Sequence, residues 1–233
     1  CILGGVIHAQ DDQPYVMEGS GNKISGKAIE ADDNGNIKLT IGDGVTRTFK
    51  LNEYEYAYTP KPKEVKALER ALLNEKYDVI LDNSSDVFKK YKYLGWAAVI
   101  GSIQAEAYLA EDKPRQALQA VNFAENFTHF NKIQLKRAKV KSLVAVGELV
   151  KAKEILKELK TAKSAEFAAF AYTTQGDILR KQGQNHAAVL EYLKPVLVIK
   201  SESAKEEIEA ARQKVVSLLK EMGDDRYKKF QKK

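Results

Sequence analysis

The chain has 233 residues, a net charge of +6 and 44% hydrophobic content, which suits one large domain or one domain with a small extra module. No apolar run approaches the ~18 residues of a membrane span. The charge is uneven: residues 1–60 hold 5 Lys/Arg and 9 Asp/Glu, a net of −4, and residues 61–233 hold 33 and 23, a net of +10. The basic second part could attract acidic proteins, nucleic acid or anionic surfaces, or could be a solvated helical face.

The first residues indicate export. Cys1 is the only cysteine, which excludes an internal disulfide. Residues 1–9 are small and apolar up to Ala9, and the sequence turns polar at Gln10, as after the cleavage site of a secretory signal peptide. We therefore predict a signal-peptide remnant over residues 1–9 and a periplasmic or cell-envelope location. The alternatives are a lipid-anchored Cys1, or a cloning remnant or simple flexible N-terminus, in which case the protein is cytoplasmic.

Residues 14–59 are rich in glycine and predict a small β module. The expected strands cover residues 14–18, 23–31, 36–41, 45–51 and 54–58. Asn34-Gly35 is the strongest short hairpin signal, because both central residues of such a turn need positive φ. Ile37, Leu39 and Ile41 alternate as in a half-buried strand. We expect the stripe of Tyr54, Tyr56 and Tyr58 to pack against the following helices, although a ligand platform is the alternative.

The order of these strands and glycine turns resembles the small barrels of the Src-homology and Sm-like type. The resemblance implies a five-stranded, strongly bent β barrel, and barrels of this kind bind peptides or nucleic acid. Because the module is acidic, nucleic acid is an unlikely partner for it.

Residues 60–63 form a linker, in which two prolines disfavour helix and suit a short, stiff connection. From Glu64 onwards, apolar residues recur at spacings of three and four, as amphipathic helices require. We predict four helical pairs over residues 64–199, a final helix over residues 203–222 and a polar tail over residues 223–233. The pairs comprise residues 64–73 with 77–90, 95–110 with 114–127, 132–146 with 149–159, and 165–182 with 185–199.

A spacing of small, bulky and turn residues recurs along these pairs. It is clearest at Gly176, Leu179, Gly183, Ala188 and Tyr192. Weaker copies occur at Val140, Leu143, Gly147, Ala152 and Leu156, and at Ala105, Tyr108, Asp112, Ala117 and Val121, with Leu68, Ala71, Glu75 and Ile80 the poorest. Small residues let two helices cross closely, and a glycine ends the first helix in a conformation that other residues resist.

This period of about 35 residues resembles the tetratricopeptide repeat, whose period is about 34. The resemblance covers roughly residues 64–220 and implies an α-α superhelix of about four repeats, capped by the last helix. It also implies a concave groove, lined by the first helix of each pair, that binds a peptide or protein segment. By their offsets, the expected groove residues are Gln134, Arg137, Lys141, Phe170, Thr173, Asp177, Arg180 and Lys181. The four cations favour an acidic partner, or they are ordinary solvated charges.

No residue cluster indicates catalysis, a metal or a cofactor. The three histidines, His8, His129 and His186, have no partners at metal-ligand or triad spacing. The glycines of residues 19–44 serve turns rather than a phosphate loop. We therefore predict a non-enzymatic α+β protein, a scaffold or adaptor of the bacterial cell envelope. A polyanion-binding helical surface and a self-assembling structural subunit are the alternatives.

Overall fold

A computed structural model describes residues 12–231 and confirms an α+β protein. Residues 1–11, which include the predicted signal-peptide remnant, lie outside the described residues. The chain divides into two compact units between Val146 and Gly147. The described part of the first unit holds all the strands and the helices up to residue 146. The second unit holds the remaining helices.

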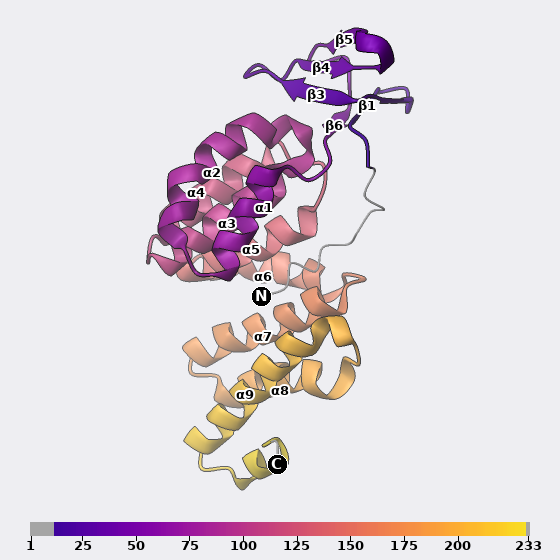
Figure 1. The fold of residues 1–233 in the computed structure, drawn as a ribbon. Coiled ribbons are helices and arrows are strands. Elements are labelled where there is room, and N and C mark those ends of the chain that lie inside the picture. Colours follow the sequence, from indigo (N-terminus) through magenta and orange to yellow (C-terminus); the bar gives the residue numbers. More distant parts are fainter. Residues whose placement is uncertain (1–11, 232–233) are drawn as a thin grey trace. The chain divides into compact units, whose positions relative to one another are not determined.

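The N-terminal module consists of two antiparallel sheets and is not a closed barrel, so the predicted five-stranded barrel is wrong (Figure 1). One sheet has the order β2-β1-β6 and the other β3-β4-β5. The strands are β1 (Tyr15–Met17), β2 (Lys23–Ser25), β3 (Ala28–Ala31), β4 (Ile37–Thr40), β5 (Thr46–Phe49) and β6 (Tyr56–Tyr58), with a short 3₁₀ helix η1 (Gly42–Gly44) before β5.

Gly26 is the reason why the module has six strands instead of the five that were predicted. The sequence predicts one strand over residues 23–31, but the chain changes sheets at this glycine. The Gly26 N–H donates to the carbonyl of Pro14 at 2.9 Å, and the next N–H, of Lys27, donates to Thr40 at 2.7 Å. A Cβ on Gly26 would lie 2.6 Å from both Leu39 Cδ1 and the Thr40 carbonyl oxygen. Only glycine permits this close approach, so the strand divides into β2 and β3.

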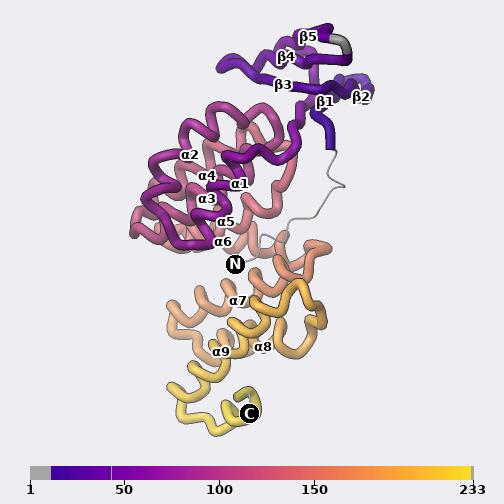
Figure 2. The backbone as a smooth tube through the Cα atoms, viewed as in Figure 1, coloured from indigo at the N-terminus to yellow at the C-terminus, as the bar shows by residue number. Residues whose placement is uncertain are grey.

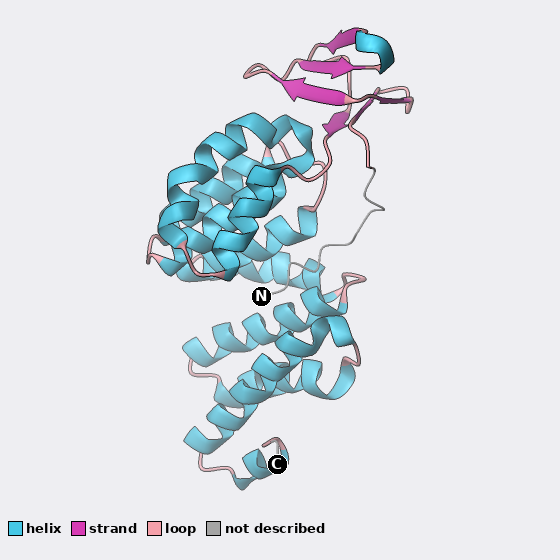
Figure 3. Cartoon of the chain, viewed as in Figure 1, coloured by secondary structure: helices cyan, strands magenta, loops and turns pink. Residues whose placement is uncertain are grey.

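Nine α-helices follow within the described residues (Figures 1 and 3). In the first unit they are α1 (Lys63–Leu73), α2 (Tyr77–Tyr91), α3 (Ala97–Ala110), α4 (Pro114–Glu125) and α5 (Lys132–Ala145), with a π-helical turn η2 (Lys92–Trp96) between α2 and α3. In the second unit they are α6 (Leu149–Lys160), α7 (Ala165–Lys181), α8 (Asn185–Val198) and α9 (Lys205–Glu221), with 3₁₀ helices η3 (Glu202–Ala204) and η4 (Asp225–Lys229). All nine predicted helices are confirmed, and their ends differ from the prediction by at most two residues.

The turns within the four predicted pairs share one backbone conformation. Glu75, Asp112, Gly147 and Gly183 have φ values of 55°, 53°, 84° and 73°. After α3, the N–H of Lys113 donates to the carbonyl of Tyr108 at 2.8 Å, and after α7 the N–H of Gln184 donates to that of Leu179 at 3.0 Å. Such bonds satisfy carbonyls at the end of a helix around a left-handed residue. The predicted turn positions are thus the left-handed positions, even where the residue is not glycine.

Helix packing follows one pattern in both units (Figure 2). In the first unit α3 contacts α1, α2, α4 and α5, and in the second unit α7 contacts α6, α8 and α9. Small residues allow these contacts. A Cβ on Gly176 in α7 would lie 2.4 Å from Tyr192 Cε1 in α8, and one on Gly101 in α3 would lie 2.4 Å from the Cβ of Ala124 in α4. Helices α3 and α7 therefore each pack tightly on the helix that follows in the chain.

Aromatic side chains join the strands to the helices of the first unit. The rings of Tyr58 and Trp96 lie 6.2 Å apart, those of Tyr56 and Phe130 4.9 Å apart, and Trp96 Nε1 donates to the carbonyl of Thr59 at 2.9 Å. Gly95 has a φ of 88° and leaves room for Tyr58 and Phe130 beside it. Of the predicted tyrosine stripe, Tyr58 packs against the π-helical turn and Tyr56 against the loop before α5, whereas the Tyr54 hydroxyl donates to the carbonyl of Gly35.

The C-terminal residues predicted as a polar tail include η4, and Tyr227 and Phe230 pack against the buried cluster formed by α8 and α9. Across residues 12–231, none of the helices is both long and apolar enough to pass through a membrane.

Candidate functional site

The predicted groove residues of α5 lie in the first unit and are half-buried. They are Gln134, Arg137 and Lys141. Lys141 Nζ donates to Glu106 of α3 at 2.6 Å, and the two side chains are 32% and 29% exposed. This cation is therefore already compensated by a carboxylate of the same unit. A partner that used Lys141 would have to compete with Glu106 for it.

Two of the five predicted residues of α7 are buried. Phe170 is 6% exposed and Thr173 is 5% exposed. The Thr173 hydroxyl donates to the carbonyl of Ala169 at 2.9 Å, one turn earlier on the same helix. A threonine hydroxyl that is satisfied by its own helix needs no external partner. These two side chains consequently offer little surface to a ligand.

Asp177 connects α7 to both following helices. Its Oδ1 accepts a hydrogen bond from the Tyr192 hydroxyl of α8 at 2.7 Å and one from Lys214 Nζ of α9 at 2.6 Å. Burial, followed by the hydrogen bond to Asp177, raises the pKa of Tyr192 above its usual value. The phenol therefore remains protonated and keeps donating to the carboxylate.

Arg180 and Lys181, at the end of α7, are both exposed. Arg180 Nη2 donates to the two carboxylate oxygens of Glu221 at 2.8 and 2.7 Å. This ion pair lies near solvent, with side chains 40% and 50% exposed, and such pairs contribute little to stability. Lys181 forms no ion pair within residues 12–231. It is the predicted cation that is most accessible to a partner.

The structure thus brings together two of the predicted residues, Asp177 and Arg180, on the part of α7 that faces α9. The three residues on α5 belong to the other compact unit. Sequence spacing predicted Asp177 and Arg180 as residues of a ligand-binding groove, and in the structure both contact α9. The spacing did not identify α9 as the element that makes the contact, because Lys214 and Glu221 lie 37 and 41 residues further along the chain.

The described residues hold no group of three or more His, Cys, Asp or Glu side chains placed to bind a metal ion. His129, which is exposed and stacks on Tyr56 with ring centroids 5.9 Å apart, has its pKa lowered, mainly by partial burial and further by Lys132. His129 and Tyr56 thus pack on each other, and neither belongs to a group of metal-binding side chains within the described residues.

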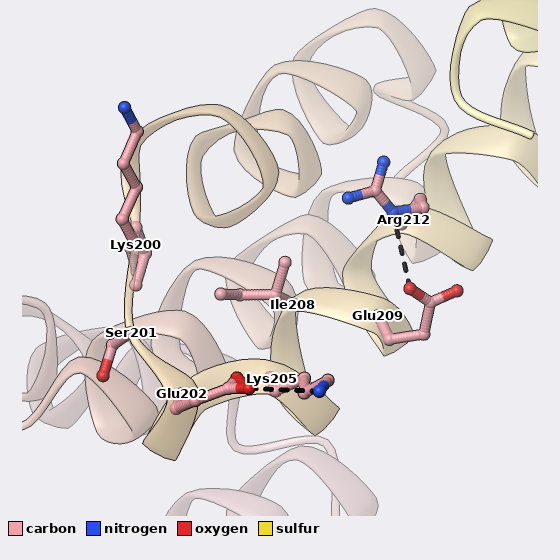
Figure 4. Close-up of a pocket in the computed structure, with 8 residues that line it drawn as sticks. Lys200, Ser201, Glu202, Lys205, Ile208, Glu209 and Arg212 are labelled. Atoms are coloured by element: carbon pink, nitrogen blue, oxygen red, sulfur yellow. Dashed lines mark hydrogen bonds and ion pairs between the residues drawn. The ribbon is translucent and has the colours of Figure 1, made fainter. Parts of the chain in front are cut away.

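One surface feature was not predicted from the sequence: an open hollow of about 390 Å³ where the chain passes from α8 to α9. The residues around it include Ile199, Lys200, Glu202, Lys205, Ile208 and Arg212 (Figure 4). In this view Ile208 stands between Lys200 and Arg212.

Compared with known proteins, the chain matches no protein-family model, no curated protein and no solved structure.

Proposed function

We propose that the chain is a non-catalytic scaffold of tetratricopeptide-like repeats that binds a peptide or protein segment. The observation that carries the proposal is the shared helix packing. Both α3 and α7 contact the helix before them, the helix after them and the second helix after them. The left-handed residues at Glu75, Asp112, Gly147 and Gly183 support the same repeat register. Repeats of this kind leave one face of each first helix available to a ligand.

The proposed binding surface lies on the second unit, where Lys181 and Arg180 are exposed on α7. The cations favour a partner segment with carboxylates, which would compete with Glu221 for Arg180. The side chains of Phe170 and Thr173 are buried and do not contribute to this surface.

Site-specific photo-crosslinking on the full chain tests this proposal. A photoreactive amino acid replaces Lys181, and a matched control replaces Lys157, an exposed cation on α6. We expect a partner to cross-link from Lys181 and not from Lys157, and the adduct to weaken when Arg180→Glu is added. The same adduct from both positions would show non-specific association and would contradict the proposal.

We also propose export to the cell envelope, supported by the signal-like residues 1–9. Intact mass measurement of the protein isolated from its native cells tests this. A mature chain that begins at Gln10 agrees with cleavage after Ala9. A chain that retains residues 1–9 without a lipid on Cys1 argues for a cytoplasmic protein instead.

Polyanion binding is the second candidate function, because residues 132–163 hold 10 Lys/Arg and 3 Asp/Glu. Among these cations, carboxylates of the same unit pair with Lys139 (Glu125), Lys141 (Glu106), Lys151 (Glu148) and Lys160 (Glu191), at 2.6, 2.6, 2.6 and 3.1 Å. That internal compensation favours the protein-binding proposal. Retention on heparin resin with a steep salt dependence would reverse this preference.

A further inference from the structure

The loop that joins β3 to β4 holds the only Asn-Gly pair of the chain, Asn34-Gly35 (Figure 1). Every other asparagine precedes a residue with a side chain, which shields the following backbone nitrogen. Because glycine lacks that shield, Asn-Gly is the pair in which this nitrogen most readily attacks the asparagine side chain. Asn34 is exposed, and Gly35 is buried next to Leu51 and Tyr93. The loop thus places a reactive pair at the boundary between solvent and the folded module.

The reaction of such a pair is deamidation, and it needs only water. The Gly35 nitrogen bonds to Cγ of Asn34, its proton passes through solvent to the side-chain nitrogen, and that nitrogen leaves as ammonia. Water then opens the resulting imide ring at one of its carbonyl carbons, where the bond to the Gly35 nitrogen breaks. Opening at the backbone carbonyl carbon gives isoaspartate, and opening at Cγ gives aspartate. Neither step changes an oxidation state.

Hydrogen bonds to the carboxylate of Asp32 hold this loop closed. Asp32 Oδ1 accepts from the backbone N–H of Asn34 at 2.9 Å and from that of Asn36 at 2.8 Å, and Oδ2 accepts from Nδ2 of Asn36 at 2.7 Å. The bond from the Asn36 side chain, followed by the bond from its backbone N–H, lowers the pKa of Asp32. The carboxyl group therefore stays ionised at neutral pH and keeps accepting these bonds.

The reactive nitrogen is itself engaged in the closed loop. The Gly35 N–H donates to the carbonyl of Asp32 at 3.1 Å, and the Gly35 carbonyl accepts from the Tyr54 hydroxyl at 2.6 Å. The φ of 83° at Gly35 is typical of the glycine that follows the turn in a short hairpin loop. Attack on Cγ of Asn34 requires the peptide group between Asn34 and Gly35 to rotate, and this rotation breaks the bond to Asp32. The folded loop therefore opposes the reaction.

We propose that Asn34 is a deamidation site of this chain, and that the hydrogen bonds of Asp32 and Tyr54 restrain the reaction until the β3–β4 loop opens. The rate then follows the fraction of molecules in which the loop is open. Isoaspartate adds one carbon to the backbone, and both products place a new negative charge beside Asp32 and Asp33. The modified loop cannot close with the same bonds, so the change is irreversible. This proposal is independent of the proposed binding surface on α7.

Peptide mapping by mass spectrometry tests the proposal on the full chain, incubated in mildly alkaline buffer with and without guanidinium chloride. We expect the unfolded chain to deamidate at Asn34 before any other asparagine, and the folded wild type to react there at least about tenfold more slowly. Asp32→Ala removes three hydrogen bonds and should accelerate the reaction of the folded chain about tenfold. Tyr54→Phe removes one bond and should accelerate it about threefold.

Asp33→Ala is the matched control. Asp33 is a carboxylate of the same loop that accepts none of these bonds, and its ion pair with Lys89 at 3.1 Å is exposed, so this change should alter the rate by less than about twofold. Circular dichroism shows whether each variant is folded, and the wild type with and without denaturant tests the proposal even if Asp32→Ala is not. Three outcomes would overturn the proposal: equal rates in the folded and unfolded chain, an unfolded chain that reacts first at another asparagine or not at all, and equal acceleration by Asp33→Ala and Asp32→Ala.

Discussion

Tyr192 of α8 donates a hydrogen bond of 2.7 Å to Asp177 of α7, and Lys214 of α9 donates to the same oxygen at 2.6 Å. A single carboxylate therefore connects three helices of the second unit. Tyr192 is fully buried, and its ring also packs over Gly176. The contact between α7 and α8 therefore includes a hydrogen bond and a close approach at a position without a side chain.

Replacing Tyr192 with phenylalanine should lower the free energy of unfolding by about 1–2 kcal/mol. The ring would still fill the space, but Asp177 would lose one of its two donors. Urea unfolding measures the change. Tyr108→Phe is the control, since the Tyr108 hydroxyl makes no hydrogen bond in the described part of the chain, and its cost should be near zero. Equal losses for the two variants would contradict a specific role for the Asp177 bond.

Gly176→Ala should destabilise the second unit by about 1–3 kcal/mol, because its new methyl group would lie 2.4 Å from Tyr192 Cε1. A second replacement, Tyr192→Leu, should cost less in the Gly176→Ala background than in the wild type, because the two positions share one space. Chemical denaturation of the single and double variants gives the coupling. Gly19→Ala, which meets no atom within 4 Å, should change stability little. If the losses of stability caused by Gly176→Ala and Tyr192→Leu were additive, the close approach of Gly176 and Tyr192 would not limit stability.

Glu75→Gly and Asp112→Gly should each stabilise the first unit by about 0.5–1 kcal/mol. Both residues have positive φ, 55° and 53°, a conformation that costs L-residues roughly 1–2 kcal/mol and glycine much less. Some of this gain is offset by the greater freedom of glycine in the unfolded chain. Glu111→Gly is the matched control: Glu111 has a φ of −87°, so this change should destabilise. A loss of stability in the two test variants would refute the strain argument.

The stability contribution of Tyr54 should decrease at high pH. Its hydroxyl donates to the carbonyl of Gly35 at 2.6 Å, and burial raises its pKa from 10.0 to about 12. The folded state thus favours the protonated phenol, so this contribution is complete below pH 10 and is lost as the pH rises from 10 towards 12. The difference in unfolding free energy between wild type and Tyr54→Phe should shrink over this interval. A constant difference would contradict the assigned pKa.

The helices could be predicted from the sequence because their cause is local. The three- and four-residue apolar spacing, Pro114 at the first turn of α4 and glycines such as Gly183 after α7 are visible in the sequence itself. The barrel prediction failed at Gly26, where the constraint is not local. This glycine is required by the backbone of Thr40 and the side chain of Leu39, which only the folded sheet brings near.

The candidate site was less predictable for the same reason. Repeat offsets predicted Asp177 and Arg180 as residues of a ligand-binding groove, and the sequence does not show that Lys214 and Glu221 of α9 pair with them. The hollow between α8 and α9 also requires structure, because it arises from the path of residues 199–205 between two helices. Side-chain partners far apart in sequence depend on tertiary packing, which repeat spacing does not specify.

Trp96 is the only tryptophan of the chain and is 5% exposed within the first unit. Its fluorescence therefore serves as a built-in reporter of residues 12–146, whereas far-ultraviolet circular dichroism follows the helices of both units. If the two compact units melt as one cooperative body, the two signals will trace a single transition. If they melt independently, the emission of Trp96 will change at one temperature and part of the helical signal at another.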